Sequence, residues 1–131
     1  MNLAFDIDDT ITAKPDLFAG LSSALGVKKV LIVSSRGNSE ESRRLTLAEL
    51  ENYGIRHSGL YLLEDGQEAR NRCPHLDLDW YQKYLWQKVE ICQREKIDVV
   101  FEDDEKVIAL FHRYAPEILV MQVHQRRGDR P

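Results

Sequence analysis

The amino-acid sequence predicts an α/β domain with about five mainly parallel strands in one sheet and helices on both of its faces. Three observations support this prediction. Apolar runs rich in β-branched residues alternate with segments of helical apolar period. The run at 29–34 is almost entirely apolar, which is typical of a strand buried on both faces. Polar residues follow the expected strands, at the edge where open parallel sheets bind ligands.

The first half of the chain is expected to alternate strand and helix. Pro15 suits the first turn of a helix because its missing N–H would have no partner there, and Gly26 suits the end of that helix. Asn38 or Ser39 is expected to cap the next helix, which ends at Gly54. The expected elements are a strand at 2–6, a helix at 15–25, a strand at 29–34, a helix up to residue 53 and a strand at 59–63.

The second half continues this alternation after an irregular segment. Residues 64–79 have no clear apolar period and contain Gly66 and Pro74, so we expect a long loop, which in a compact domain is usually functional or mobile. The expected elements after it are a helix at 80–96, a strand at 98–101, a helix at 106–114 and a strand at 117–123. The repeated alternation predicts a Rossmann-like, doubly wound sheet.

Composition narrows the class of protein and its partners. With 131 residues, 43% hydrophobic and 31% charged, the chain is expected to form one domain with a true core rather than a disordered segment. The net charge of −4 does not indicate a nucleic-acid-binding surface. The basic cluster of Arg126, Arg127 and Arg130 is expected to be a solvated terminus.

The same sequence argues against secretion and membrane insertion. No apolar run approaches the ~20 residues that span a bilayer, and no signal peptide fits before Asp6. Cys73 and Cys92 form neither a disulfide framework nor a metal-ligand spacing. We therefore expect a cytoplasmic protein without a membrane partner.

A cluster of carboxylates follows the first expected strand. Asp6, Asp8 and Asp9 occupy three of four consecutive positions. Alternate side chains of a strand share a face, so Asp6 and Asp8 are expected to point the same way, where their charges repel. A bound cation or a single retained proton relieves such repulsion, and phosphoryl transfer uses both. The alternative is an acidic surface turn in which Asp9 and Thr10 cap a helix.

The segment Asp6-Ile7-Asp8-Asp9-Thr10 resembles the first motif, Asp-x-Asp-x-Thr, of the haloacid dehalogenase superfamily of phosphohydrolases. This resemblance implies that Asp6 is the nucleophile and that Asp8 is the general acid and base. The fold that this resemblance implies agrees with the doubly wound sheet that the alternation of strands and helices predicts. Segments that resemble the other three motifs of the family follow in the same order along the chain, up to residue 104.

The apolar strand that ends in Ser34-Ser35-Arg36 resembles the second motif, an apolar strand closed by Thr or Ser. Ser34 is expected to bind a phosphoryl oxygen through its hydroxyl, with Ser35 as the nearer alternative. A turn capped by Ser34 is the structural alternative. Arg36 is a further candidate for contact with an anionic substrate, although a plain surface arginine fits equally well.

The third motif is one basic residue near the start of the helix before the fourth strand, and both Lys83 and Lys88 qualify. Lys88 falls within the apolar stripe of the helix. Lys83 lies closer to the helix N-terminus, which is expected at the active edge of the sheet, and Lys88 is ~7 Å farther along the axis. We therefore prefer Lys83 as the catalytic and substrate-binding lysine, whereas the stem of Lys88 could cover the sheet.

Phe101-Glu102-Asp103-Asp104 resembles the fourth motif, an apolar strand followed by paired acids. We expect Asp103 to be a metal ligand and Glu102 to be a second ligand or its support, while Asp104 suits a helix start. An acidic helix start without a metal is the alternative. By resemblance to the family, Mg²⁺ is held by the carboxylates of Asp6 and Asp103 and by the main-chain carbonyl of Asp8.

Together the four motifs imply a Mg²⁺-dependent phosphomonoester hydrolase that works through an aspartyl-phosphate on Asp6. No segment is long enough for a separate cap, so residues 1–131 are expected to form a single domain with an open site. A large substrate or a neighbouring subunit of a homo-oligomer would then cover the site. The class of the phosphorylated substrate is left open by the sequence.

Loop 64–79 is the local candidate for substrate contacts through Arg70, Arg72 and His75, with a solvated loop as the alternative for each. Two other functions fit the same fold. A receiver-type domain would accept a phosphoryl group without hydrolysing it, but its phosphorylated Asp is expected after a later, central strand. A non-catalytic binding module would need neither Asp6 nor Asp8.

Overall fold

Five parallel strands form a single sheet in the order β3-β2-β1-β4-β5. The computed structural model describes residues 1–124, so Arg126, Arg127 and Arg130 lie outside the described residues. The sheet confirms the predicted α/β class. Its strands are β1 (Asn2–Phe5), β2 (Lys29–Ser34), β3 (Gly59–Leu62), β4 (Val99–Glu102) and β5 (Leu119–Gln122).

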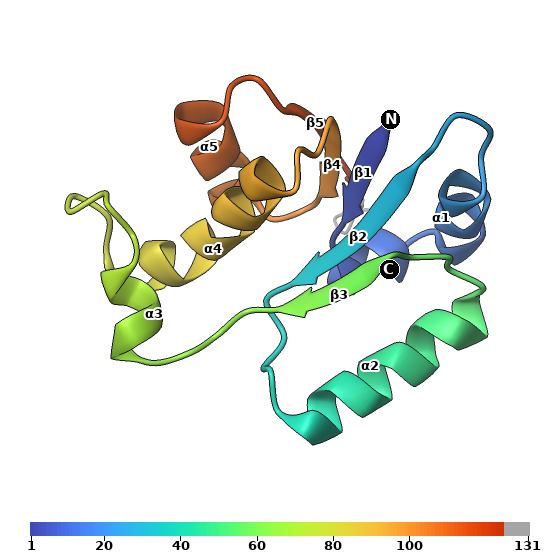
Figure 1. Cartoon of the computed structure of the whole chain (residues 1–131), viewed down its shortest axis with the longest axis horizontal. Coiled ribbons are helices and arrows are strands. Elements are labelled where there is room, and N and C mark those ends of the chain that lie inside the picture. Colours follow the sequence, from blue (N-terminus) through green and yellow to red (C-terminus); the bar gives the residue numbers. More distant parts are fainter. Residues whose placement is uncertain (125–131) are drawn as a thin grey trace, which may run out of the picture.

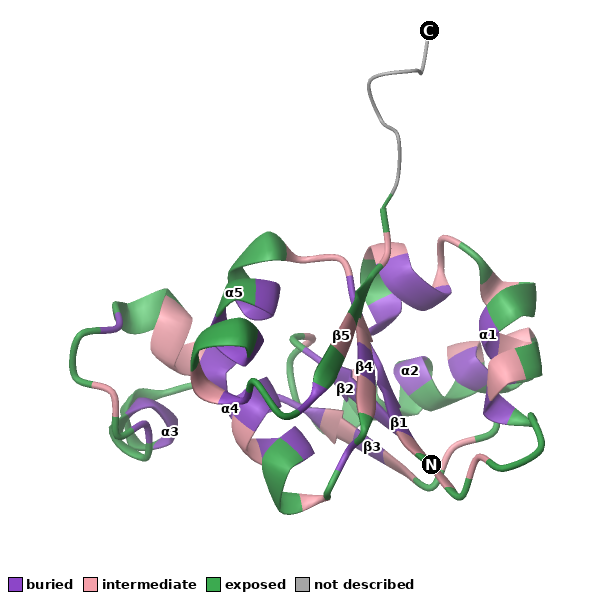
Figure 2. Ribbon diagram, turned by 90° about the horizontal axis from the view of Figure 1, so that it is seen from above, coloured by how far each residue is buried: buried purple, intermediate pink, exposed green. Residues whose placement is uncertain are grey.

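Helices cover both faces of the sheet, as the doubly wound pattern predicts (Figures 1 and 2). One face carries α1 (Pro15–Ser22) and α2 (Glu40–Tyr53), and the other carries α4 (Trp80–Arg94) and α5 (Glu105–Tyr114). The short helix α3 (Gln67–Asn71) lies beyond the sheet, beside the start of α4. Within residues 1–124, no helix combines the length and apolar character needed to cross a bilayer.

Two apolar clusters, one on each side of the sheet, form the core. Val89 of α4 and Phe111 of α5 are completely buried against one face. On the other face, Phe5, Phe18 and Phe101 meet edge to face with ring centroids 4.9–5.5 Å apart. Because β1 is buried between the two clusters, the residue that follows it is held rigidly at the carboxyl edge of the sheet.

The chain turns sharply after β1, in the segment η1 (Ile7–Ile11). The strand ends at Phe5, one residue earlier than expected, although Asp6 keeps an extended backbone and its N–H donates to the Phe101 carbonyl at 3.1 Å. Asp9 takes a left-handed conformation with φ of +61°, which is uncommon for a residue other than glycine. Its N–H donates to Thr12 Oγ1 at 2.9 Å, and this bond helps to hold the turn.

Most of the predicted helix boundaries are confirmed. Helix α1 begins at Pro15, Ser39 caps α2 by accepting the Ser42 N–H, and Gly54 ends α2 with a φ of +74°. Two predictions were wrong. Helix α1 ends at Ser22, before Gly26, and the segment 64–79 contains α3 rather than a continuous loop.

Candidate active site

The candidate site lies at the carboxyl ends of β1 and β4, which are neighbours at the centre of the sheet. Asp6 follows β1, Glu102 is the last residue of β4, and Asp103 follows it. A pocket of about 190 Å³ opens at this point. Its lining is strongly acidic and consists of Asp6, Asp8, Asp9, Ser35, Lys88, Glu102, Asp103 and Asp104.

A buried lysine joins the two strands at the floor of this pocket. Lys88 Nζ lies 2.9 Å from Asp6 Oδ1 and 2.8 Å from Glu102 Oε2. Each of these three side chains is at least nine-tenths buried. A buried charge of this kind is tolerated only when it is paired and hydrogen-bonded, so the three groups form one unit.

The structure brings Lys88, rather than the preferred Lys83, to the candidate site. Lys88 contacts Asp6, whereas Lys83 lies near Cys73, on whose thiol its charge acts, and it does not line the pocket. The position at which α4 begins explains why Lys88, and not Lys83, reaches the pocket. Figure 1 shows that α4 begins beyond the carboxyl ends of β2 and β3, so its first turn overshoots the sheet. The residue level with the strand ends comes more than one turn later, at Lys88.

Thr10 links Asp6 to Asp103 on the other side of the nucleophile candidate. Its hydroxyl lies 3.3 Å from Asp6 Oδ2 and 3.2 Å from Asp103 Oδ1, and the residue is fully buried. The two Asp6 oxygens thus have different surroundings, with Lys88 at Oδ1 and the Thr10–Asp103 pair at Oδ2. The sequence placed Thr10 in the first motif, with a helix cap as the alternative, but did not indicate that its hydroxyl joins Asp6 to Asp103.

Burial and charge distribute protons unequally over the three carboxyls. Burial raises the pKa of Asp6, but the Lys88 ammonium and the hydrogen bonds outweigh it, so the pKa lies below its ordinary value. Burial raises the pKa of Glu102 to about 8, although Lys88 opposes this. Burial, the Asp6 hydrogen bond and the Asp6 charge raise the pKa of Asp103 to about 6. Burial alone would lower the pKa of the Lys88 ammonium, but its two carboxylate partners outweigh this effect and raise the pKa above its ordinary value.

The donor set suits a hard divalent cation. Asp6, Glu102 and Asp103 each offer a carboxylate oxygen, and these oxygens lie within 4.8 Å of one another. Both oxygens of Glu102 already have partners, since Oε1 accepts the N–H groups of Asp103 and Asp104 at 3.2 Å and Oε2 binds Lys88. The geometry therefore makes all three carboxylates candidate ligands, and Glu102 in addition orients Lys88.

Asp8 also borders the pocket, but its carboxylate is held from another side. Arg36 donates to Asp8 Oδ1 from Nη2 at 2.8 Å and to Oδ2 from Nε at 3.1 Å. The same guanidinium donates to Glu49 Oε1 at 2.9 Å and to Thr46 Oγ1 at 3.2 Å. Arg36 is thus a clamp between Asp8 and α2, a role that the sequence analysis missed because Glu49 lies 13 residues farther along the chain.

The two serines after β2 occupy different positions. Ser34 is buried, and its Oγ accepts the Arg36 N–H at 3.1 Å, as expected for a side chain that stabilises a turn. Ser35 lines the pocket, and its carbonyl accepts a hydrogen bond from the Tyr84 hydroxyl at 2.7 Å. Ser35, the alternative candidate, therefore lines the acidic pocket, whereas Ser34 does not.

None of the three candidates in segment 64–79 lines the acidic pocket. The guanidinium of Arg70 is buried and stacks over Trp80 at 4.1 Å, while it pairs with Asp65. Arg72 pairs with Glu64, and His75 stacks on Tyr114 with centroids 3.7 Å apart. These contacts hold all three side chains outside the acidic pocket.

Comparisons with models of known protein families and with curated proteins found no match to this chain.

Proposed function

We propose that this protein is a Mg²⁺-dependent phosphomonoester hydrolase with Asp6 as its nucleophile. The observation that carries the proposal is the asymmetric environment of Asp6 at the carboxyl edge of the parallel sheet. One oxygen is fixed by the buried Lys88, and the other faces Asp103 across Thr10. A carboxylate that is kept ionised and oriented in this way suits attack on phosphorus.

The carboxylates of Asp6 and Asp103 and the main-chain carbonyl of Asp8 are the groups proposed to hold Mg²⁺. When bound, the ion would offset the negative charge of these carboxylates and of the phosphate, and so permit their approach. The proximity of these carboxylates supports this assignment, because one oxygen each of Asp6, Glu102 and Asp103 lies within 4.8 Å of the others.

In the first proposed step, an Asp6 carboxylate oxygen bonds to phosphorus, and the bond from phosphorus to the ester oxygen breaks. Asp8 donates its proton to the leaving oxygen. In the second step Asp8 takes a proton from water, the water oxygen bonds to phosphorus, and the acyl phosphate bond to Asp6 breaks. Arg36 holds the Asp8 carboxyl group in a fixed orientation beside the pocket through hydrogen bonds to both of its oxygens. Lys88 and Ser35 lie where they would contact or orient the phosphoryl group.

Release of inorganic phosphate from para-nitrophenyl phosphate in the presence of Mg²⁺ tests this proposal. We expect turnover by the wild type, none by Asp6→Asn, and an accumulated phosphoprotein in Asp8→Asn, which would lack the base for the second step. Asp16→Asn is the matched control, because Asp16 is an exposed carboxylate on α1 outside the pocket.

Two results would contradict the hydrolase. A wild-type phosphoprotein that forms from acetyl phosphate but does not turn over would indicate a receiver-type domain. Absence of both turnover and phosphorylation, with a correctly folded protein, would indicate a binding module. Activity retained by Asp6→Asn would show that another residue attacks phosphorus.

A further inference from the structure

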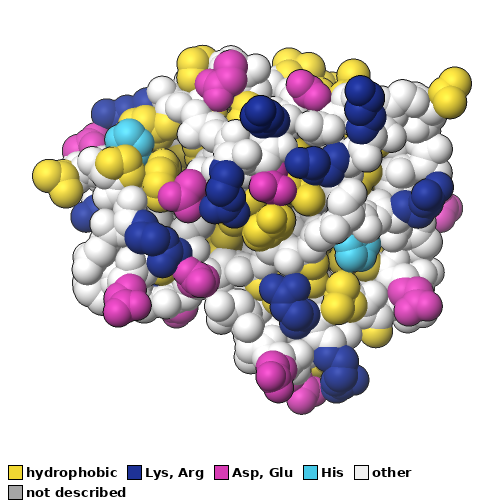
Figure 3. Space-filling model, viewed as in Figure 1, with side chains coloured by type: hydrophobic (Ala, Val, Ile, Leu, Met, Phe, Trp, Pro, Cys, Tyr) yellow, Lys and Arg dark blue, Asp and Glu magenta, His cyan; other side chains and the backbone are white. Residues whose placement is uncertain are grey.

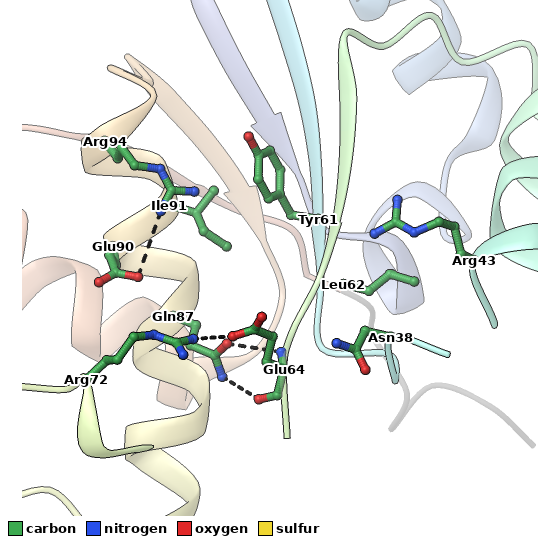
Figure 4. Close-up of a pocket in the computed structure, with 10 residues that line it drawn as sticks. All are labelled: Asn38, Arg43, Tyr61, Leu62, Glu64, Arg72, Gln87, Glu90, Ile91 and Arg94. Carbon is green, nitrogen blue, oxygen red and sulfur yellow. Dashed lines mark hydrogen bonds and ion pairs between the residues drawn. The ribbon is translucent and has the colours of Figure 1, made fainter. Parts of the chain in front are cut away.

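A second and larger pocket, of about 470 Å³, lies beside β3 at the edge of the sheet (Figure 4). Tyr61 and Leu62 of β3 lie between wall residues from α4 and the side chain of Arg43 from α2. Among residues 1–124, none lines both this pocket and the acidic one. Its volume falls within the range of small-ligand sites, about 300–1,000 Å³, and the proposed hydrolase mechanism gives it no role.

Three arginines from three segments converge on this pocket. Arg43 belongs to α2, Arg72 follows α3, and Arg94 ends α4. Figure 4 shows their guanidinium groups turned inward, with Arg43 on one side of β3 and the other two on the opposite side. Guanidinium groups are well suited to phosphate and carboxylate because they offer five N–H donors in a fixed plane.

The contacts of these arginines within the protein do not use all of their guanidinium N–H donors. Arg43 Nη1 donates to the Leu60 carbonyl at 3.1 Å, Arg72 Nη2 pairs with Glu64, and Arg94 Nη1 approaches Glu90 only to 4.0 Å. Each of these contacts involves a single guanidinium nitrogen. The remaining nitrogens of each fork are the groups that an anionic ligand would bind.

The walls of the pocket are held in place independently of any ligand. Gln87 is buried at the junction of α4 and β3, and its amide nitrogen donates to the carbonyls of Glu64 and Tyr84 at 2.9 and 3.0 Å. Its amide oxygen accepts the Glu64 N–H at 3.0 Å. This pairing fixes the spacing between the strand and the helix, so the basic side chains project from a preformed frame.

The local charge has the opposite sign to that of the whole chain. The pocket contains three arginines but only two acids, Glu64 and Glu90, whereas the chain carries a net charge of −4. On the surrounding face, basic and acidic side chains are interspersed (Figure 3). The positive charge is therefore a local feature that suits a small anion, and it is not part of a broad field of the kind that binds nucleic acid.

We propose that this pocket, the basic pocket, binds a small polyanion that carries at least two phosphate or carboxylate groups. The arginines stand on both sides of β3, so a ligand with several separated anionic groups makes contacts that a single anionic group does not. The proposal is independent of the hydrolase reaction, since neither Asp6 nor Asp103 lines the basic pocket.

Isothermal titration calorimetry on protein freed of metal with a chelating resin tests this proposal, with tripolyphosphate and citrate as separate probes at matched ionic strength in a buffer without EDTA. This treatment leaves the acidic pocket without a metal, so its carboxylates repel both probes. We expect wild-type protein to bind at least one probe, and the stronger of the two to identify the phosphate or the carboxylate source. In Arg94→Gln, loss of charge-assisted hydrogen bonds should weaken binding by about tenfold.

Three further variants separate a binding role from a structural one. Glu90→Gln removes the acid beside Arg94 and should tighten binding, which a merely structural arginine would not produce. Arg44→Gln is the matched control, because Arg44 adjoins Arg43 but pairs with Glu41 outside the pocket. Asp6→Asn should bind as the wild type does. Thermal unfolding of each variant verifies that it is folded.

Absence of binding by the wild type to either probe overturns the proposal. Equal losses in Arg94→Gln and Arg44→Gln would show a nonspecific charge effect and would also overturn it. Binding that is stronger in Asp6→Asn and unchanged in Arg94→Gln would place the anion in the acidic pocket, and would contradict the basic pocket while leaving the hydrolase open to its own test.

Discussion

Lys88 carries one positive charge between two carboxylates in a region that water hardly reaches. One ammonium cannot fully neutralise both acids. Asp6 remains the more acidic carboxyl, while the pKa of Glu102 rises to about 8. Asp6, the candidate nucleophile, therefore carries the negative charge, while Glu102 helps to orient Lys88. This division explains why a lysine in the middle of an otherwise apolar helix face is compatible with the fold.

Lys88→Met should strongly destabilise the protein, because it leaves Asp6 and Glu102 buried without their counter-charge. Breaking a buried ion pair by removing one partner typically costs about 3–5 kcal/mol in the free energy of unfolding. Urea denaturation measures this loss. Lys83→Met is the control, and it should change stability by less than about 1 kcal/mol because Lys83 has no such buried pair.

The double variant Lys88→Met/Glu102→Gln distinguishes lost charge balance from lost packing. Removing the second acid should restore part of the stability lost by Lys88→Met. If the double variant is as unstable as the sum of the two single variants predicts, the three side chains do not act as one unit.

His57 provides a prediction about pH. Burial lowers its pKa below the ordinary value near 6.5, and its Nδ1 is buried without a hydrogen-bond partner in the described part of the chain. The unfolded chain therefore binds a proton at a higher pH than the folded protein does. This contribution to stability is fully present above about pH 6.5 and is lost as the pH falls toward the folded pKa.

Thermal unfolding measured between about pH 7.5 and about pH 5 should show this effect when wild type is compared with His57→Gln. Glutamine does not titrate, so the variant should lose less stability than the wild type over this interval. The other titrating groups contribute equally to both proteins. Parallel pH curves for the two proteins would show that His57 is not protonated differently in the folded and unfolded states.

At the scale of elements, helices with a clear apolar side and a clear end were predictable. Pro15, Ser39 and Gly54 take the terminal positions that their chemistry favours. Helix α3 was missed because five residues are too few to show an apolar period. Helix α1 stops at Ser22 because Ser22 Oγ bonds back to the Ala19 carbonyl and also accepts the Arg56 N–H, a contact across 34 residues that no local pattern reveals.

The candidate site was predictable where it follows strand ends, and unpredictable where it depends on where a helix begins. Asp6 and Asp103 could be placed together because parallel strands end at one edge. The choice of lysine required knowing how far α4 extends beyond the sheet, which depends on the path of residues 64–79. The contact between Arg36 and Glu49 likewise depends on the packing of α2 against β2, and the sequence does not encode it in a local motif.

The N-cap of α2 provides a prediction about the stability of the protein. Ser39→Ala removes the hydroxyl that accepts the Ser42 N–H at 3.1 Å, and we expect a loss of about 1 kcal/mol in the free energy of unfolding. Ser23→Ala is a matched control. Ser23 is exposed at the C-terminal end of α1, and its side chain makes no capping hydrogen bond within residues 1–124. Equal effects of the two substitutions in urea denaturation would contradict the capping role.

For the whole molecule, the strand order explains why acids distant in sequence repel each other in space. Strand β1 pairs with β4, so Asp6 and Asp103 meet although 97 positions separate them. Folding therefore brings two carboxylates together, and their repulsion lowers the stability of the folded state unless another interaction offsets it. A bound divalent ion would provide that interaction, and it would make the stability of the entire domain depend on the metal.

Mg²⁺ should thus raise the thermal unfolding midpoint of the wild type, with a gain of about 2.7 kcal/mol at a hundredfold excess over its Kd. Asp103→Asn should change the protein in two opposite ways. In EDTA it should be more stable than the wild type, because the repulsion from Asp6 is gone while the amide oxygen still accepts the Thr10 hydrogen bond. With Mg²⁺ it should lose most of the added stability. Asp16→Asn and NaCl of equal ionic strength are the controls. A midpoint that rises equally with Mg²⁺ and with NaCl, or an Asp103→Asn variant that keeps the full increment, would show that the two carboxylates do not bind the ion together.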